Sequence, residues 1–192
     1  EIKNVKENIQ CKPISNYGKN KYRIEKLIKI LLEKSHTKYF ILRIFNVVGD
    51  QIPFNKEIFL KRNNLISNVF KSIVFKKKLN LFGYKCATKD GTCVRDYLEI
   101  SKFVKIVLSL ISNRDKLNSS IFNVGSSIGL SNLEIIHKIQ NLLKIKIQFN
   151  KKRKRKIDTV YLVSNNEKLR KTLNLKKSFF NTDKILSGYK KY

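Results

Sequence analysis

The apolar residues of this chain alternate between helical and extended spacing, and this alternation restricts the chain to one fold class. Within 16–34, five apolar residues recur at helical spacing: Ile24, Leu27, Ile28, Leu31 and Leu32. That spacing places one apolar stripe of a helix against a core. The next segment, 40–45, is almost continuously apolar, as expected of a strand covered on both faces. Helices and strands in this order favour parallel pairing and an α/β fold.

The same reasoning predicts the remaining elements. The expected helices cover 64–76, 101–111, 131–143, 166–173 and 182–189, the expected strands 79–83, 94–100, 121–125 and 145–149, and a loop 50–62. Ser101 and Ser131 are the expected N-caps of two of these helices, and Glu134 completes a capping box with Ser131. The pair Asp90-Gly91 predicts a turn.

Length and composition exclude several classes of protein. The chain has 192 residues, 42% of them hydrophobic, which suffices for a sizeable core. No apolar run reaches the ~18 residues of a spanning helix and no signal peptide is visible, so we expect a cytoplasmic protein without membrane contact. Three cysteines without a CxxC pair and two distant histidines argue against a disulfide framework and against a metal site.

The charge of the chain raises a second interpretation. The 42 Lys and Arg residues against 14 Asp and Glu residues give a net charge of +28, with a basic run at 151–156. Such a balance is typical of nucleic-acid binding. The basic residues are nevertheless spread along the whole chain, and the aromatic residues lie mostly within apolar strands rather than among them. A basic nucleic-acid-binding protein therefore stays as the alternative to the function argued below.

Tyr17 and Lys21 are the first residues whose spacing suggests chemistry. Separated by four positions, they share one face of the first predicted helix. An ammonium group near a phenol favours the phenolate, which can act as a base near neutral pH. Lys21 could also donate a hydrogen bond to a ribose hydroxyl. On a lysine-rich helix such a pair also arises by chance, so both interpretations stay open.

Further motifs follow this pair in a fixed order. They are YGKNK at 17–21, LRIFNVVG at 42–49, NNL at 63–65, LFG at 81–83, DGTCVRDY at 90–97 and FNVG at 122–125. The ordered set resembles the extended short-chain dehydrogenase/reductase family, and within it the branch that interconverts UDP-glucose and UDP-galactose. DGTCVRDY is the most specific of these motifs, and the resemblance covers essentially the whole chain.

The resemblance implies a fold, a cofactor and a substrate. It implies an α/β fold: part of a Rossmann-like doubly wound sheet, with only its later strands, plus a smaller C-terminal sugar-nucleotide-binding subdomain. Residues 1–50 would be a remnant of the NAD-binding domain. Residues 51–192 would be mainly the substrate-binding domain, with some segments returning to the Rossmann sheet. NAD would be the cofactor, a UDP-hexose the substrate and a homodimer the assembly, with no specific nucleic acid.

The resemblance also implies a role for individual residues. Tyr17 and Lys21 would be catalytic and, with Phe45, would contact NAD, while Tyr17 takes the proton of the sugar's 4-hydroxyl. The residues expected to bind the UDP-sugar are Asn46, Asn64, Leu65, Asn80, Leu81, Phe82, Arg95, Arg155 and Leu162. The two arginines suit a diphosphate. Structural roles remain the alternatives: loop caps for Asn46 and Asn64, core packing for Phe45 and Phe82, an ion pair with Asp96 for Arg95, and a mere place in the basic run for Arg155.

Two parts of the family pattern are missing from the sequence. The Gly-rich GxxGxxG turn that holds the NAD pyrophosphate is absent, and so is the catalytic Ser or Thr upstream of the tyrosine. The resemblance is therefore to the C-terminal portion of the enzyme. We expect the chain alone to be inactive without the N-terminal half, or to be an inactive remnant. Several apolar side chains would then lack part of their cover: Ile24, Leu27, Leu31, Ile41 and Phe45.

Overall fold

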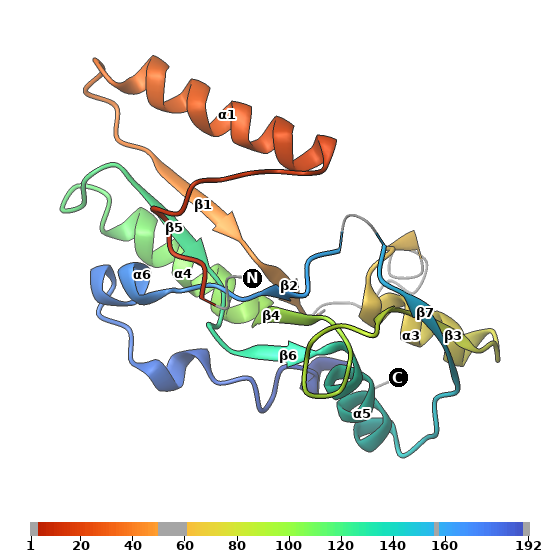
Figure 1. The fold of residues 1–192 in the computed structure, drawn as a ribbon. Helices are drawn as coiled ribbons and strands as arrows, with labels where there is room; N and C mark the ends of the chain where they lie inside the picture. Colours follow the sequence, from red (N-terminus) through yellow and green to blue (C-terminus); the bar gives the residue numbers. More distant parts are fainter. Residues whose placement is uncertain (1–3, 50–60, 156–157, 190–192) are drawn as a thin grey trace.

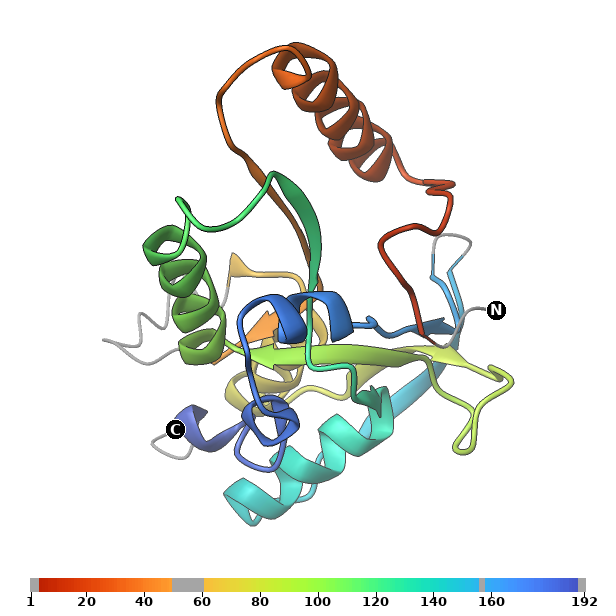
Figure 2. The ribbon, with the colours of Figure 1, turned by 90° about the vertical axis from the view of Figure 1, so that its left-hand side faces the viewer.

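The computed structural model describes residues 4–49, 61–155 and 158–189 of the chain. In chain order the elements are α1 (Asn16–Leu32), β1 (Phe40–Ile44), β2 (Asn46–Val48), α3 (Leu65–Val74), β3 (Leu79–Tyr84), β4 (Val94–Glu99), α4 (Ile100–Ser112), β5 (Ser120–Val124), β6 (Gly129–Ser131), α5 (Asn132–Leu143), β7 (Phe149–Arg153), β8 (Tyr161–Leu162), α6 (Glu167–Thr172) and the 3-10 helices η1 (Lys177–Phe180) and η2 (Ser187–Tyr189). Figures 1 and 2 show their arrangement. The loop predicted at 50–62 lies, except for its last two residues, outside the described part.

β1 and β5 form a two-stranded parallel sheet. Their register pairs Phe40 with Ser120 and Ile44 with Val124. α6 packs against β5, and α4 packs against β2 and β4 (Figure 1). Side chains from these elements and from η1 form one hydrophobic core: Leu98, Ile106, Leu110, Phe122, Val124, Leu169 and Phe180. Both predicted strands are confirmed, and their parallel pairing requires a long crossover of the kind that contains α3 and α4.

The second sheet is built around β4. β2 lies parallel to β4, with Asn46 opposite Tyr97, while β6 and β8 flank the first half of β4, antiparallel and parallel respectively. The chain changes sheets between Phe45, whose N–H donates to the carbonyl of Val124 at 3.0 Å, and Asn46. The predicted apolar strand therefore continues directly into a second short strand beside β4.

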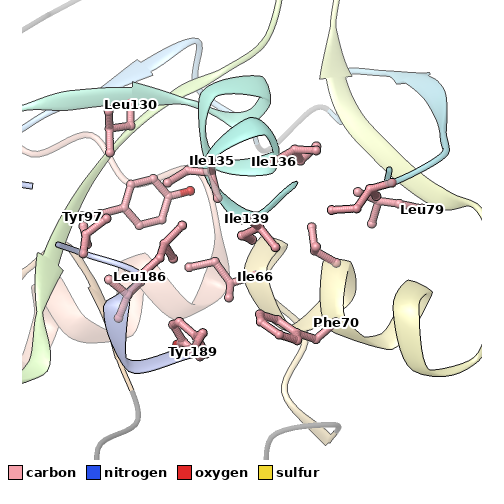
Figure 3. Close-up of a cluster of buried hydrophobic side chains, with 14 of the residues drawn as sticks. Ile66, Phe70, Leu79, Tyr97, Leu130, Ile135, Ile136, Ile139, Leu186 and Tyr189 are labelled. Atoms are coloured by element: carbon pink, nitrogen blue, oxygen red, sulfur yellow. The ribbon is translucent and has the colours of Figure 1, made fainter. Parts of the chain in front are cut away.

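β3 and β7 form a further parallel pair, next to the second hydrophobic core. The register of the pair shifts between Phe82 and Tyr84, around Gly83 with its φ of +86°. α3 packs against β3 and α5, and Figure 3 shows how their side chains meet. The buried members of this core include Ile66, Val69, Phe70, Leu79, Leu81, Tyr97, Ile135, Ile136, Ile139, Leu186 and Tyr189.

The start of α5 confirms the predicted capping box. Ser131 Oγ accepts from the N–H of Glu134 at 3.0 Å, and Glu134 Oε2 accepts from the N–H of Ser131 at 2.6 Å. Both bonds satisfy donors that the first turn of a helix leaves without intrahelical partners.

The N-cap predicted at Ser101 is wrong. α4 begins at Ile100, with Glu99 at the N-cap position and no capping hydrogen bond from its side chain. β4 continues as far as Glu99 and passes into α4 without a turn. Ser101 therefore lies inside the first helical turn rather than before it.

The strand predicted at 145–149 and the helix predicted at 182–189 are also wrong in detail. Only Phe149 of the predicted strand belongs to β7, since the pairing with β3 begins at this residue. The side chain of Ile147, two residues earlier, is buried in the second core. Within 182–189, where a helix was predicted, the structure has the short 3-10 helix η2. The preceding helix, α6, is confirmed.

α1 stands apart from the two cores (Figures 1 and 2). Of its apolar stripe, Ile24, Leu27 and Leu31 are exposed, with 73% at Leu31, and Ile28 and Leu32 are half-buried, whereas Glu25 is its buried residue. The expectation that this stripe packs on a core is therefore wrong for this chain, while its expected lack of cover is confirmed. Within the described ranges, no helix combines the length and apolar character that crossing a bilayer would need.

Candidate functional site

A cavity of about 620 Å³ lies between β2, β4, β3 and the start of α3. Its size suits a ligand as large as a nucleotide. The structure brings together seven of the predicted substrate-binding residues around it: Asn46, Asn64, Leu65, Asn80, Phe82, Arg95 and Arg155. Residues that were not themselves predicted to bind the substrate, some of them within the same motifs, complete the wall: Val47, Val48, Asn63, Ile66, Asn68, Leu79, Cys93, Tyr97, Asn132 and Asp158.

The two arginines of the cavity are held by different partners. Arg95 Nη1 donates to the carbonyl of Val94 at 2.9 Å. Arg155 forms a bidentate salt bridge with Asp158, in which Nε donates to Oδ2 and Nη2 donates to Oδ1, each at 3.0 Å. The guanidinium of Arg155 also lies 5.4 Å from the centre of the Phe82 ring. Arg155 is therefore not just one member of a solvated basic run. Its contact with Asp158, another lining residue, holds its guanidinium at the cavity wall.

The charge state of Asp158 follows from this contact. Burial alone would raise the pKa of its carboxyl, but the hydrogen bonds and charge of Arg155, with the charge of Arg95, hold that pKa below its usual value. Asp158 is therefore ionised at neutral pH. The charged side chains among the described lining residues, two arginines and one aspartate, leave one net positive charge in the cavity.

Asp96 lies on the opposite side of β4 from Arg95, because successive residues of a strand point to opposite faces. Its fully buried carboxylate accepts five hydrogen bonds, from the N–H and Oγ of Ser126, the N–H of Ser127, and the N–H and Oγ of Ser164. The carboxylate thus ties β4 to the segments around 126 and 164. Its hydrogen-bonding capacity is taken up by these donors, which removes the reason to explain Arg95 as its structural ion pair.

The predicted asparagines of the cavity differ in whether their side-chain amides are hydrogen-bonded within the protein. Asn64 caps α3, its Oδ1 accepting from the N–H of Ser67 at 2.9 Å, so the structural role considered for it is present alongside its place in the cavity. Asn46 Nδ2 donates to the carbonyl of Asp96 at 2.9 Å. Asn80 is exposed on β3. Each amide retains polar atoms that a ligand could reach.

Asn132 and Tyr97 line the cavity although neither was predicted to bind the substrate, and Tyr97 is the last residue of the motif DGTCVRDY. Asn132 is the first residue of α5, and its Nδ2 donates to the carbonyl of Phe82 at 3.2 Å. The capping box at Ser131 was the signal that could have placed it at a helix N-terminus. Tyr97 is buried, and this burial raises the pKa of its phenol to about 12 despite the opposing charge of Arg95. Its hydroxyl therefore stays protonated at neutral pH.

The remaining predicted site residues do not line this cavity. Tyr17 and Lys21 share an exposed face of α1, as their spacing predicted, with Lys21 Nζ 5.5 Å from the centre of the Tyr17 ring. Phe45 is half-buried where the chain passes from β1 to β2. Leu81 is fully buried in the second core, and Leu162 lies on β8, opposite Arg95 of β4.

Comparison with known proteins gives one family and consistent relatives. The sequence profile of the NAD dependent epimerase/dehydratase family matches residues 2–125. A UDP-glucose 4-epimerase of Lactobacillus helveticus is 31% identical over 186 residues, which make up 95% of this chain and 56% of that protein. The chain therefore spans little more than half the length of this relative.

Solved structures agree with the observed fold. A crystal structure of a UDP-glucose 4-epimerase superposes with a TM-score of 0.84 at 25% identity, over 99% of this chain and 59% of that one. The UDP-glucose 4-epimerase from Bifidobacterium longum, solved with NAD+ and UDP, superposes with a TM-score of 0.78 at 23% identity, over 96% of this chain and 60% of that one. The predicted α/β fold with part of a Rossmann-like sheet is confirmed.

Proposed function

This chain belongs to the NAD dependent epimerase/dehydratase family, and from that premise we propose that it carries the substrate site of a UDP-sugar 4-epimerase acting on UDP-glucose and UDP-galactose. The observation that carries the proposal is the shared cavity. Residues from five separate stretches of sequence, each predicted to bind a UDP-sugar, meet in one space of about 620 Å³. Their convergence is not a consequence of any one motif.

The nucleotide would be held by charge and by amides. Arg95 and Arg155 would bind the diphosphate, because a guanidinium group matches two phosphate oxygens at once. The one net positive charge among the described lining side chains favours an anionic ligand. Asn80 and the main chain beside it would contact uracil, next to the exposed face of Phe82. Asn46, Asn64 and Leu65 would complete the contacts, with Leu162 near the sugar.

The proton transfer would be carried by α1. Tyr17 would accept the proton of the sugar's 4-hydroxyl, with the Lys21 ammonium, 5.5 Å from the Tyr17 ring centre, as the nearby positive charge. Tyr17 is 74% exposed, Lys21 is exposed and Phe45 is half-buried, and these side chains would contact the nicotinamide and its ribose when NAD is bound. NAD, when bound, supplies the acceptor and donor of the C4 hydride. Because most proposed contacts hold the nucleotide, the sugar would be free to turn between the two hydride transfers.

We extend the proposal to the domain organisation. Residues 1–50 would belong to the NAD-binding domain, and 51–192 mainly to the substrate-binding domain, with α4 and β5 returning to the first. Two observations support this division. β1 pairs with β5, and, among the residues that the structure describes, the buried side chains around this pair form a separate cluster from those around α3 and α5.

Calorimetric titration with three ligands tests the proposed nucleotide site. UDP, ADP and uridine are compared at 0.15 M salt, because a chain of net charge +28 attracts any anion at low ionic strength. We expect UDP to bind at least about 10-fold more tightly than ADP, which has the same charge but another base. Uridine, without the diphosphate, should bind more weakly than UDP. Equal affinity for UDP and ADP would contradict a uracil-reading site.

The chain supplies its own control for the catalytic pair. Tyr22 and Lys26 form a second pair at the same spacing on α1, with Lys26 Nζ 4.8 Å from the Tyr22 ring centre. Conversion of UDP-galactose is measured with added NAD+. Any turnover should fall about 10²- to 10⁴-fold in Tyr17→Phe and stay unchanged in Tyr22→Phe. UDP binding without any turnover would instead identify an inactive chain with an intact nucleotide site.

A further inference from the structure

Two cysteines face each other in the connection between β3 and β4. The Sγ atoms of Cys86 and Cys93 lie 3.3 Å apart, and Cys86 Sγ also lies 3.3 Å from the carbonyl of Gly83. The mechanism proposed above uses neither thiol. Cys11, the third cysteine of the chain, makes a long contact with the carbonyl of Ile9 at 3.9 Å and interacts with the charge of Arg43.

The backbone of this connection holds the two thiols in place. Tyr84 and Thr92 form an antiparallel bridge, and the N–H of Cys86 donates to the carbonyl of Gly91 at 2.9 Å. Gly91 lies at a φ of +78°, which suits a glycine in this turn. The connection is therefore a hydrogen-bonded hairpin-like turn. Its geometry fixes the approach of Cys86 to Cys93.

The glycine at 83 gives the sulfur of Cys93 its space. A Cβ atom at Gly83 would lie 2.7 Å from Cys93 Sγ, too close for any other residue without a shift. A disulfide bond requires the two sulfurs to approach to about 2.05 Å, which is about 1.2 Å less than their present separation. Rotation of two side chains on this fixed backbone is a small change compared with a movement of the chain.

The two thiols differ in their access to reagents. Cys93 is 2% exposed, and burial is the main cause that raises the pKa of its thiol to about 11, with the neighbouring Cys86 adding to it. Cys86 is half-exposed. A reagent in solution therefore meets Cys86 first, and Cys93 is in position to react second.

We propose that Cys86 and Cys93 form a dithiol modification site, which low-molecular-weight disulfides convert to an intramolecular disulfide. Cys86, as the thiolate, attacks a disulfide RSSR, which forms a mixed disulfide and releases one thiol RSH. Cys93 then loses its proton and attacks Cys86 Sγ, which breaks the mixed bond and releases the second RSH. The two cysteines are oxidised by two electrons, and RSSR is reduced to two thiols.

The site adjoins the cavity described above. Cys93 lines that cavity, two residues before Arg95 on the same stretch of chain. Oxidation would draw the sulfur of Cys93 toward Cys86 and so alter the cavity wall. The formation of the disulfide itself does not depend on what the cavity binds, so its test is independent of the proposed function.

Glutathione disulfide and mass spectrometry test the site on the full chain. After oxidation, free thiols are alkylated under denaturing conditions and the protein is digested with trypsin. Because Lys85, Lys89 and Arg95 are cleavage sites, the expected product joins peptide 86–89 to peptide 90–95. We expect Cys86 and Cys93 to be recovered in this cross-linked product and to become alkylatable again on reduction. Cys11, half-exposed like Cys86, would carry at most a separate glutathione adduct.

Single variants separate this route from unspecific oxidation. Cys93→Ala should accumulate a stable glutathione adduct at Cys86, whereas Cys86→Ser should leave Cys93 unmodified. Cys11→Ser is the matched control and should form the same disulfide as the wild type. Wild-type protein that keeps three free thiols, or that stops at the Cys86 adduct as Cys93→Ala does, would overturn the proposal.

Discussion

At the scale of single side chains, two neighbouring residues of β4 have different roles, one facing the cavity and the other stabilising the fold. Arg95 lines the cavity, while Asp96 points into the interior and accepts five hydrogen bonds from three serines. The motif DGTCVRDY therefore joins a ligand-facing residue to the residue that fixes its strand. Substitutions at the two positions should consequently fail in different ways.

Replacing Arg95 should weaken ligand binding and leave the fold intact. A hydrogen bond to a charged group contributes about 1.5–3 kcal/mol, so Arg95→Ala should weaken UDP binding about 10- to 100-fold in a calorimetric titration. Arg114→Ala is the control, because Arg114 carries the same charge at an exposed position beside Asp115. An equal loss in both variants would mean that UDP responds only to the overall charge of the chain.

Replacing Asp96 should instead destabilise the protein. Asp96→Asn replaces one carboxylate oxygen, which accepts hydrogen bonds, by an NH₂ group, which cannot accept them. The serine donors that faced this oxygen then lose their acceptor in the buried interior. We expect a decrease of about 2–4 kcal/mol in the free energy of unfolding, measured by urea denaturation. Asp115→Asn, whose side chain is 86% exposed, should change it by less than about 0.5 kcal/mol. A stable Asp96→Asn protein would contradict the role assigned to this carboxylate.

At the scale of helices and strands, the sequence predicted what local patterns determine. The helices α3 and α5 follow from apolar periodicity and from capping residues, which act within a few positions of one another. β7 was misplaced because its basic residues, such as Lys151 and Lys152, carry no apolar alternation. Its position depends on the pairing with β3, about 70 residues earlier in the chain. Pairing between distant segments leaves little trace in a local pattern.

The capping box of α5 allows a test at this scale. Ser131→Ala removes the acceptor for the N–H of Glu134 and also a hydrogen bond to Asp90. We expect a loss of about 1–2 kcal/mol in the free energy of unfolding, measured by chemical denaturation. Ser101→Ala is the control, since Ser101 lies inside α4 and caps nothing. A similar loss in both variants would show that the capping bond is not the cause.

The attachment of α1 to β1 should depend on pH. Burial alone raises the pKa of Glu25, but the hydrogen bonds and charge of Arg43, aided by Lys29, outweigh it and hold the pKa below the ordinary 4.5. A group with a lowered folded-state pKa stabilises the fold above its unfolded-state pKa and loses that contribution as the pH falls through the folded value. Glu25→Gln should therefore be less stable than the wild type at pH 7, by roughly 1 kcal/mol.

Denaturation of both proteins between pH 7 and pH 3 checks this expectation. The difference in the free energy of unfolding should shrink progressively below pH 4.5 as the carboxyl of Glu25 becomes protonated. Glu33→Gln, at an exposed position just after α1, should show no comparable difference at any pH. A constant difference over the whole range would exclude the charge of Glu25 as its origin.

At the scale of the whole molecule, the site depends on a meeting of distant segments. Motifs predicted which residues belong to it, because each motif carries its chemistry locally. The sequence could not predict which of them share a cavity: Leu81 and Leu162 lie outside its wall, while Asn132 and Tyr97 lie within it. The sheet topology contributes to this, since β2 pairs with β4 and β3 pairs with β7.

The ion pair between Glu25 and Arg43 connects α1 to β1, with Arg43 Nη2 donating to Oε1 at 2.7 Å and Nε to Oε2 at 3.0 Å. A helix joined to its protein in this way can detach while both cores remain folded. Its backbone amides should therefore exchange with deuterium at least about 10-fold faster than those of α5, when followed by mass spectrometry. Glu25→Gln should speed the exchange in α1 alone. In this protein, the segment with the proposed proton acceptor would open and close on its own timescale.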